Sequence, residues 1–329
     1  MKNFTRPQML LNRALLGLTT LLVASGMLNA QPKLTYSEAV ASHPDWVQIP
    51  GELIRPDCIH QIPAGATVSI SDDANAGDDI ILKGQVIAHY EACSEEAIVT
   101  RQSPSQPGGL VPSVGNGWVE DTNWAPKLKK GDDIDWLQNQ FVVPSAPKKN
   151  GAIVFLFNGI EPKSGKWIMQ PVLQYGPSAA GGGNYWAMAS WLVGTTKAYF
   201  SALTPVHAGD MMVGTMEQTD NSGGTLAYIV DAYDATSTAE TALEFRSKGI
   251  KWGWAFQAVL EAYNVTTCNN FPASGQVKFY NTEMAHGFPS FDLYSPLNFH
   301  GEFDNYGGSG GPSCGFSTSV SGGAAVLQF

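Results

Sequence analysis

Histidine is the side chain that most often binds a metal ion or transfers a proton near neutral pH. The chain has six of them, at His43, His60, His89, His207, His286 and His300. No two stand in an H-x-H or H-E-x-x-H pattern, which would bring two imidazoles to one side of a strand or helix. We therefore expect no metal site in this protein.

A serine with the spacing of a nucleophile occurs near the C-terminus. Ser309 lies in Gly307-Gly-Ser-Gly-Gly-Pro312, which fits G-x-S-x-G and is similar to the G-D-S-G-G-P segment of chymotrypsin-like proteases. A nucleophile elbow needs a strand before the serine and a helix after it, and the serine needs a neighbouring base. This serine stands in a glycine-rich tail, with no histidine segment of that family upstream. We interpret the segment as a loop.

The four cysteines are far apart and form no C-x-x-C pair, which excludes zinc-knuckle and thioredoxin-like sites. They are Cys58, Cys93, Cys268 and Cys314. An even number suits two disulfides in an exported protein. Proximity along the chain favours the pairs Cys58–Cys93 and Cys268–Cys314, although all three connectivities are open.

The N-terminus is typical of a secretory signal peptide. Lys2, Arg6 and Arg13 precede the apolar run Ala14–Ala24, and small and polar residues follow it. This run is shorter than the roughly 20 apolar residues that span a bilayer. We expect residues 1–30 to be removed and the mature protein to be secreted, into the extracellular space or the periplasm, and free of the membrane.

Composition and charge restrict the partners of the protein. Charged residues make up 15% of the chain and aromatic residues 11%, with 35 Gly and 20 Pro, which is typical of a globular protein with many short strands and turns. The net charge of −10 comes with no basic stripe along the sequence. We therefore expect no binding to nucleic acid or to an anionic membrane, and we expect a monomer.

Two regions follow the expected signal peptide. In residues 31–117, Thr67–Ile70 alternates like a strand and a second apolar stretch covers Ile80–Tyr90, which predicts a small β-rich segment. Gln102–Gly109 is rich in Pro and Gly and has the composition of a linker.

Strand-like runs recur at intervals of about ten residues in the region 118–329, and Gly, Pro, Asn or Asp bounds each of them. They are Gln140–Pro144, Ala152–Phe157, Trp167–Tyr175, Tyr185–Val193, Met211–Met216, Leu226–Val230, Ala255–Tyr263 and Gln276–Tyr280. We find no helical periodicity among them and no internal repeat. The pattern predicts an all-β fold, an antiparallel β-sandwich of the jelly-roll or concanavalin-like kind, with an irregular glycine-rich tail.

Several segments of this region follow one another in the order of a known family. They are Phe141–Pro144, Asn158–Glu161, Pro171–Gly176, Tyr185–Trp191, Ala208–Asp210, Gln257–Ala262 and Phe271–Phe279. In this order they resemble the F-T-V-P, G-I-D, I-L-Q-T-G, W-Y-E-W-Y, E-G-D, W-I-V-E-D and F-x-x-F-G-x-V-x-F segments of the eqolisins, the glutamic peptidases of the scytalidoglutamic type. The resemblance covers about residues 118–282 and rests on collinearity.

The resemblance implies a catalytic pair of Gln174 and Glu261. A carboxylate can take a proton from water and return it to a leaving amine, and an amide can stabilise the oxyanion of the intermediate. The residues implied to line the substrate cleft are Tyr175, Trp186, Trp191 and Phe157. No cofactor is implied. Ser190 departs from the family, because it stands where the aromatic strand of the family carries its acid.

The residue types leave some roles open. Gln170 competes with Gln174, and Glu161 or Glu217 could supply a second glutamate, as in the related neprosin-type peptidases. The glycine-rich Ser178–Asn184 is either a mobile loop beside a cleft or a plain hairpin connection.

The function that we expect is that of a secreted acid endopeptidase acting on peptides or proteins. Residues 31–117 would then be a prosegment released at the linker, or a retained accessory domain. The alternative is a non-catalytic β-sandwich that binds glycans or cell-surface material through the same aromatic residues.

Overall fold

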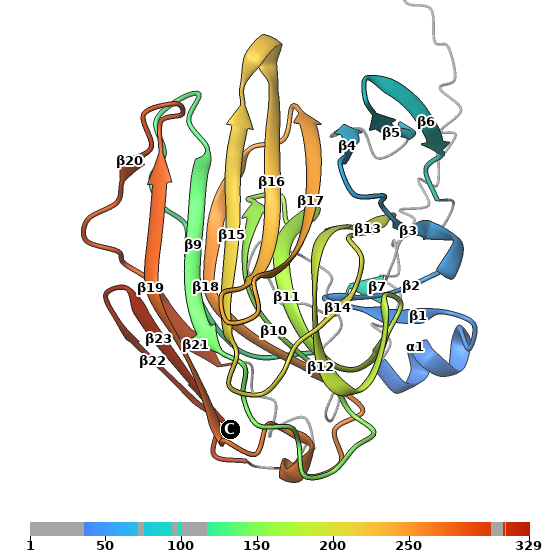
Figure 1. The fold of residues 1–329 in the computed structure, drawn as a ribbon, viewed down its shortest axis with the longest axis vertical. Coiled ribbons are helices and arrows are strands. Elements are labelled where there is room, and N and C mark those ends of the chain that lie inside the picture. The colour runs from blue at the N-terminus through green and yellow to red at the C-terminus, as the bar shows by residue number, and fades with distance from the viewer. Residues whose placement is uncertain (1–35, 72–75, 94–97, 100–116, 304–311, 313) are drawn as a thin grey trace, which may run out of the picture. The chain divides into compact units, whose positions relative to one another are not determined.

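Strands make up nearly all the regular structure of the chain. The computed structural model describes residues 36–71, 76–93, 98–99, 117–303, 312 and 314–329. Two large sheets pack against each other, and a small third sheet accompanies them (Figure 1). The prediction of an all-β sandwich is confirmed. The expected signal peptide, the linker at 102–109 and Ser309 lie outside the described residues.

The first large sheet has nine strands. Their order is β21 (His300–Phe303), β8 (Gly117–Trp124), β18 (Trp252–Tyr263), β10 (Ile153–Pro162), β11 (Trp167–Ser178), β12 (Gly181–Gly194), β13 (Ala198–Phe200) and β3 (Ile59–Gln61), with β14 (Thr204–Pro205) paired to β12. Both β10 and β18 are buried along their whole length. Strands covered on both faces carry nearly continuous apolar runs, as these two do.

The second large sheet has eleven strands. Their order is β22 (Ser317–Ser321), β23 (Ala324–Gln328), β19 (Gln276–His286), β9 (Ile134–Val142), β15 (Met211–Asp220), β16 (Thr225–Asp234), β17 (Ala239–Lys248), β4 (Ala66–Ser71), β5 (Asp78–Leu82) and β6 (Gln85–Tyr90), with β20 (Asp292–Leu293) paired to β19. Buried and more exposed residues alternate along β15 and β17, so one face of this sheet is covered. We expected the tail to be irregular, but it contains the β22–β23 hairpin. Burial alternates along both of its short strands.

The remaining elements are small. The third sheet consists of β1 (Val47–Ile49), β2 (Glu52–Ile54) and β7 (Ile98–Val99). The helices of the described residues are α1 (Tyr36–Ser42) and the short 3-10 turns η1 (Pro56–Cys58), η2 (Ser222–Gly224) and η3 (Cys268–Asn270). None of them is long and apolar enough to cross a membrane.

Apolar side chains fill both sides of the nine-stranded sheet. Between the two large sheets, residues such as Val154 and Leu156 of β10 pack with Phe141 and Phe279. On the other side, which we call the outer face, Phe155 and others pack with the N-terminal hairpin β1–β2. This hairpin is therefore a third layer over the sheet.

The N-terminal segment also extends the two large sheets. Strand β3 pairs in parallel with β13, and β4 pairs in parallel with β17. The apolar stretch that we expected at Ile80–Tyr90 is divided between β5 and β6. Lys83 and Gly84 connect them with φ values of 51° and 78°, as in the two-residue turns that favour hairpins. Residues 33–329 accordingly cluster as one unit.

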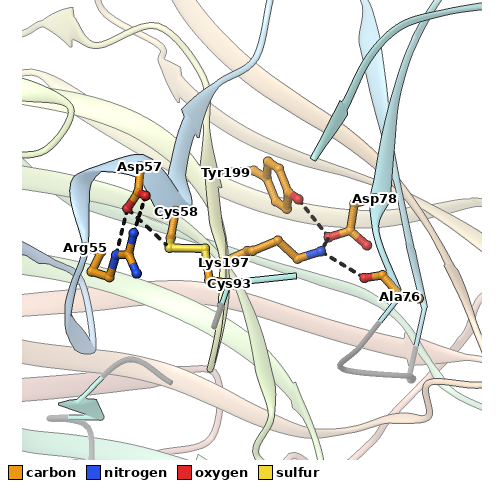
Figure 2. Close-up of a disulfide and its surroundings, with 8 residues drawn as sticks. All are labelled: Arg55, Asp57, Cys58, Ala76, Asp78, Cys93, Lys197 and Tyr199. Atoms are coloured by element: carbon orange, nitrogen blue, oxygen red, sulfur yellow. Dashed lines mark hydrogen bonds and ion pairs between the residues drawn. A yellow bond between two sulfur atoms is a disulfide. The ribbon is translucent and has the colours of Figure 1, made fainter. Parts of the chain in front are cut away.

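A buried ion pair joins Asp78 of β5 to Lys197, the residue directly before β13 (Figure 2). The Lys197 ammonium lies 2.7 Å from Asp78 Oδ2, and the two side chains are 2% and 3% exposed. Lys197 also donates to the carbonyl of Ala76 at 3.1 Å, and the Tyr199 hydroxyl donates to Asp78 at 2.7 Å. Burial raises the pKa of Asp78 above its ordinary value, although the hydrogen bonds from Lys197 and Tyr199 oppose the shift.

Both expected disulfides are present. Cys58–Cys93 joins the two ends of the segment that holds β3 to β6, with Cα atoms 6.1 Å apart. Cys268–Cys314 ties the tail to the loop after β18, with Cα atoms 5.4 Å apart. Neither bridge links the N-terminal segment to the rest of the sandwich, so non-covalent contacts make that connection. They include strand pairing, the Lys197–Asp78 pair and the packing of the β1–β2 hairpin on the outer face.

We expect Lys197→Met to lower the free energy of unfolding by about 3–5 kcal/mol, because it leaves the Asp78 carboxylate buried without its cation. Urea unfolding measures the loss. The double variant Lys197→Met/Asp78→Asn removes both charges and should recover part of it. A change below about 1 kcal/mol in the single variant would contradict the role of the pair.

Candidate active site

Gln174 and Glu261 lie in one row of the nine-stranded sheet. Gln174 of β11 and Glu261 of β18 are both in register with Phe155 of β10. Residues directly opposite each other in a sheet point to the same face, so all three side chains lie on the outer face. At the usual strand spacing the Cα atoms of Gln174 and Glu261 are about 10 Å apart. The two residues are 1% and 0% exposed.

Two donors hold the carboxylate of Glu261. The backbone N–H of Gly51 donates to Oε1 at 2.6 Å, and the hydroxyl of Tyr263 donates to the same oxygen. Gly51 belongs to the turn between β1 and β2 and has a φ of 80°. Pro50 followed by a glycine of positive φ is the pattern of a type II turn. This turn directs the backbone N–H of Gly51 toward the Glu261 carboxylate.

Further contacts hold the hairpin on the outer face. The N–H of Ala179, between β11 and β12, donates to the carbonyl of Gln48 at 3.2 Å. Ile49 and Ile54 pack in the apolar cluster that includes Phe155. The hairpin thus covers the row that contains Gln174 and Glu261.

The amide of Gln174 is engaged by the hairpin that follows it. Its Nε2 donates to the carbonyls of Gly176 at 3.1 Å and Gly181 at 2.9 Å, and Ser178 Oγ donates to its Oε1 at 2.9 Å. A Cβ atom at Gly182 would lie 2.5 Å from Nε2, so the close approach requires glycine. Of the two interpretations of Ser178–Asn184, the structure has the hairpin connection, with Ser178 opposite Gly181.

The four aromatic residues expected around the cleft divide between two faces. Phe157 and Trp191 belong to the apolar cluster of the outer face, and both are 0% exposed. Tyr175 and Trp186 point the other way, into the core between the sheets, and their rings meet edge to face at 5.2 Å. The structure therefore brings Phe157 and Trp191, but neither Tyr175 nor Trp186, to the face of Glu261.

The alternative residues are also divided. Gln170 is 1% exposed and pairs with Trp191 on the outer face, and its amide makes no hydrogen bond within the described protein. Glu161 is buried on this face, opposite Trp254. Glu217 lies on β15 of the other sheet, opposite Trp136. Glu217 is therefore remote from Glu261.

Sequence reasoning missed Gly51 and Tyr263. Tyr263 stands two positions after Glu261 in a predicted strand, so alternation places both on one face. This signal was available. Gly51 is 210 residues away from Glu261 along the chain, and nothing in the sequence pattern connects the two.

Several carboxyl groups of the sandwich have raised pKa values. Burial raises the pKa of Glu120 to about 8, although the N–H groups of Gln328 and Ser317 oppose the shift. Burial raises the pKa of Asp135 to about 7, against a hydrogen bond from the N–H of Phe288. For Asp231, burial and the nearby Glu240 raise the pKa to about 7. The folded protein thus favours the protonated state of these acids.

Comparison with known proteins yields only distant structural similarities. No protein-family model matches the chain, and no curated protein matches it in sequence. Scytalido-glutamic peptidase with a transition state analog inhibitor is similar at 13% identity and a TM-score of 0.41, over 65% of this chain and 98% of that one. SCP-B, a member of the eqolisin family solved with the tripeptide Ala-Ile-His, is similar at 13% identity and a TM-score of 0.42, over 65% of this chain and 98% of that one.

Aspergilloglutamic peptidase from Aspergillus niger is similar at 16% identity and a TM-score of 0.33, over 54% of this chain and 98% of that one. Similarity at this level establishes neither membership of a family nor an activity. A proposal about function therefore rests on the contacts around Glu261.

We expect the free energy of unfolding to fall as the pH rises from about 4.5 to about 8. Over this range the unfolded chain releases the Glu120 proton at its ordinary pKa of 4.5, whereas the folded protein retains it up to about pH 8. Urea unfolding at several pH values measures the slope. Glu120→Gln should flatten it and be more stable than wild type at pH 8, by roughly 3 kcal/mol. Equal slopes would contradict this account.

Gln174 and Gln170 form a matched pair for a second test. Gln174→Met should lower the free energy of unfolding by about 2–4 kcal/mol, because it leaves the carbonyls of Gly176 and Gly181 without their donor. Gln170→Met, equally buried on the same strand, removes an amide without a protein partner and should be neutral or stabilising. Urea unfolding compares the two variants. Equal losses would contradict the assigned role of the Gln174 amide.

Proposed function

We propose that this chain is an exported peptidase in a latent state, with Glu261 as its general base. The observation that carries the proposal is the hydrogen bond from the Gly51 N–H to Glu261. The turn of the β1–β2 hairpin places a backbone N–H against the carboxylate, where we place the backbone of a bound substrate. The β1–β2 hairpin then acts as an internal occupant of the substrate site.

The proposed chemistry uses one water molecule and needs no cofactor. The Glu261 carboxylate takes a proton from water while the water oxygen bonds to the carbonyl carbon of the peptide. The resulting oxyanion needs a hydrogen-bond donor. The proton on Glu261 then passes to the peptide nitrogen, the C–N bond breaks, and a carboxylic acid and an amine leave.

Gln174 is our candidate for the oxyanion donor. Both of its amide hydrogens are engaged by Gly176 and Gly181, so one of them must be released when substrate binds. The adjoining glycines are the residues whose backbone changes conformation at least cost. We therefore assign the movement to the β11–β12 hairpin.

Activation requires removal of the hairpin and not of the whole N-terminal segment. Residues 59–90 supply strands to both large sheets and include Asp78 of the buried ion pair. A cut in the linker at 102–109 would leave the hairpin attached to these anchored strands. A cut between Ile54 and Cys58 would sever the covalent link between the hairpin and these strands, while the Cys58–Cys93 bridge stays on the retained side. Release of the hairpin then also requires that β2 separate from β7.

Two further properties support an exported protein that works in acid. Two disulfides are typical of proteins in oxidising compartments. The raised pKa values of Glu120, Asp135 and Asp231 favour the folded state at acid pH. We propose that the protein acts on peptides or proteins as a monomer after export.

The saturated amide of Gln174 favours a second candidate, a β-sandwich that binds glycans without catalysis. Glycan binding through aromatic stacking needs exposed rings. Six large hydrophobic side chains are exposed among the described residues, and Tyr185, at 45% exposure, is the one aromatic residue of the six. The peptidase proposal is therefore the better supported of the two.

The test uses a variant with a recognition sequence for a specific protease inserted between Ile54 and Arg55. After cutting and gel filtration at about pH 4, the protein is incubated with a denatured protein and the products are read by mass spectrometry. We expect cleavage by the cut protein and none by the uncut one. Glu261→Gln should reduce the rate at least about 100-fold.

Glu217→Gln is the matched control, because it makes the same change on the remote face of the other sheet and should leave the rate unchanged. If the cut protein and its Glu261→Gln form cleave at equal rates, Glu261 is not the base. If neither cleaves, the non-catalytic alternative is favoured.

A further inference from the structure

A cationic cavity lies at one end of the nine-stranded sheet. Three segments form it: residues 128–132 between β8 and β9, Pro162–Lys166 from the last residue of β10 to the residue before β11, and residues 249–253 from the connection after β17 into the start of β18. The cavity has a volume of about 510 Å³. Five of the 19 basic residues of this acidic chain line it, namely Lys129, Lys130, Lys163, Lys166 and Lys251.

Most of this positive charge is not neutralised. Lys251 lies 3.2 Å from Asp133 Oδ2, and Asp132 also lines the cavity. The other four lysines are exposed, and their ammonium groups form no ion pair with the described residues. With both aspartates ionised, three positive charges remain in excess. Such a concentration raises the local potential and attracts anions.

The apolar part of the cavity lining is aliphatic. Leu128, Pro162 and Ile250 line the cavity together with Gly249 and Gly253, and Ile250 is 4% exposed. Neither an arginine nor an aromatic ring occurs among the described residues that line the cavity. The cavity therefore combines an apolar recess with a rim of flexible ammonium groups.

We propose that this cavity binds an acidic peptide segment, with an aliphatic side chain in the recess and neighbouring carboxylates on the lysines. The lining favours this partner over two others. Nucleic acid is recognised through arginine forks and stacked bases, and sugars are recognised by stacking on aromatic rings. The residues of this cavity supply neither group. Lysine ammonium groups do pair with carboxylates as point charges.

This site is separate from the face of Glu261. Gly253 and Glu261 stand eight positions apart on the same strand, which corresponds to about 26 Å at the usual rise. The N-terminal hairpin covers Glu261, whereas the lysines of the cavity are exposed. Binding at the cavity therefore depends neither on hairpin release nor on peptidase activity.

The probe for the test is a fluorescent peptide of about eight residues that alternates Glu and Leu, and binding to the full chain is read as anisotropy at about pH 7. The double variant Lys163→Glu/Lys166→Glu should weaken binding at least about tenfold. Raising the NaCl concentration from about 50 mM to about 300 mM should weaken binding to wild type as well.

Lys148→Glu/Lys149→Glu is the control, because it changes the net charge equally in another exposed loop and should bind like wild type. Thermal unfolding of each variant checks that the fold is intact. Equal weakening by both double variants, or no binding by wild type, would overturn the proposal. Tighter binding of a sulfated sugar chain than of the peptide would overturn the peptide assignment.

Discussion

Both faces of the nine-stranded sheet are buried, and this constraint governs the rest of the structure. One face packs on the eleven-stranded sheet, and the β1–β2 hairpin packs on part of the other. A polar side chain on the outer face cannot reach water, so each hydrogen bond that the protein does not supply, as at the Gln170 amide, costs free energy. Glu261 obtains them from Gly51 and Tyr263, and Gln174 from the hairpin that follows it. The candidate site is therefore also part of the packing.

The N-terminal segment has two roles in this arrangement. Its strands β3 to β6 belong to the edges of the large sheets, where Lys197 and Asp78 meet in a buried pair. Its first hairpin instead covers the outer face and reaches Glu261 through a single turn. The disulfide between Cys58 and Cys93 divides these parts, because the hairpin precedes it and the anchored strands lie within it.

The two proposed sites lie at opposite ends of β18 and differ in the groups that would bind a ligand. At one end, a buried carboxylate meets a backbone N–H. At the other, exposed lysines surround an aliphatic recess. The buried acids elsewhere in the sandwich favour the folded state at low pH, where a carboxylate-based peptidase would work. Under the proposed function, access of substrate to Glu261 depends on release of the hairpin.

Local pattern sufficed for much of the fold. Apolar runs such as Ala152–Phe157 and Ala255–Tyr263 lie within β10 and β18, because a strand buried on both faces must be apolar along its length. Strand β17 was not predicted, because charged residues alternate with Leu243 and Phe245 and the strand contains no continuous apolar run. Proximity along the chain favoured the cysteine pairing that the structure has, although it left all three connectivities open.

The sequence by itself determined the all-β class and the positions of most central strands, because these depend on neighbouring residues. It favoured one pairing of the cysteines without excluding the other two connectivities. Only the tertiary structure decided which face each side chain occupies, as Tyr175 and Trp186 show by pointing away from Glu261. It alone brought Gly51 to Glu261 and gathered lysines from three loops into one cavity. The physical reason is register: pairing between distant strands sets these contacts, and no short stretch of sequence encodes it.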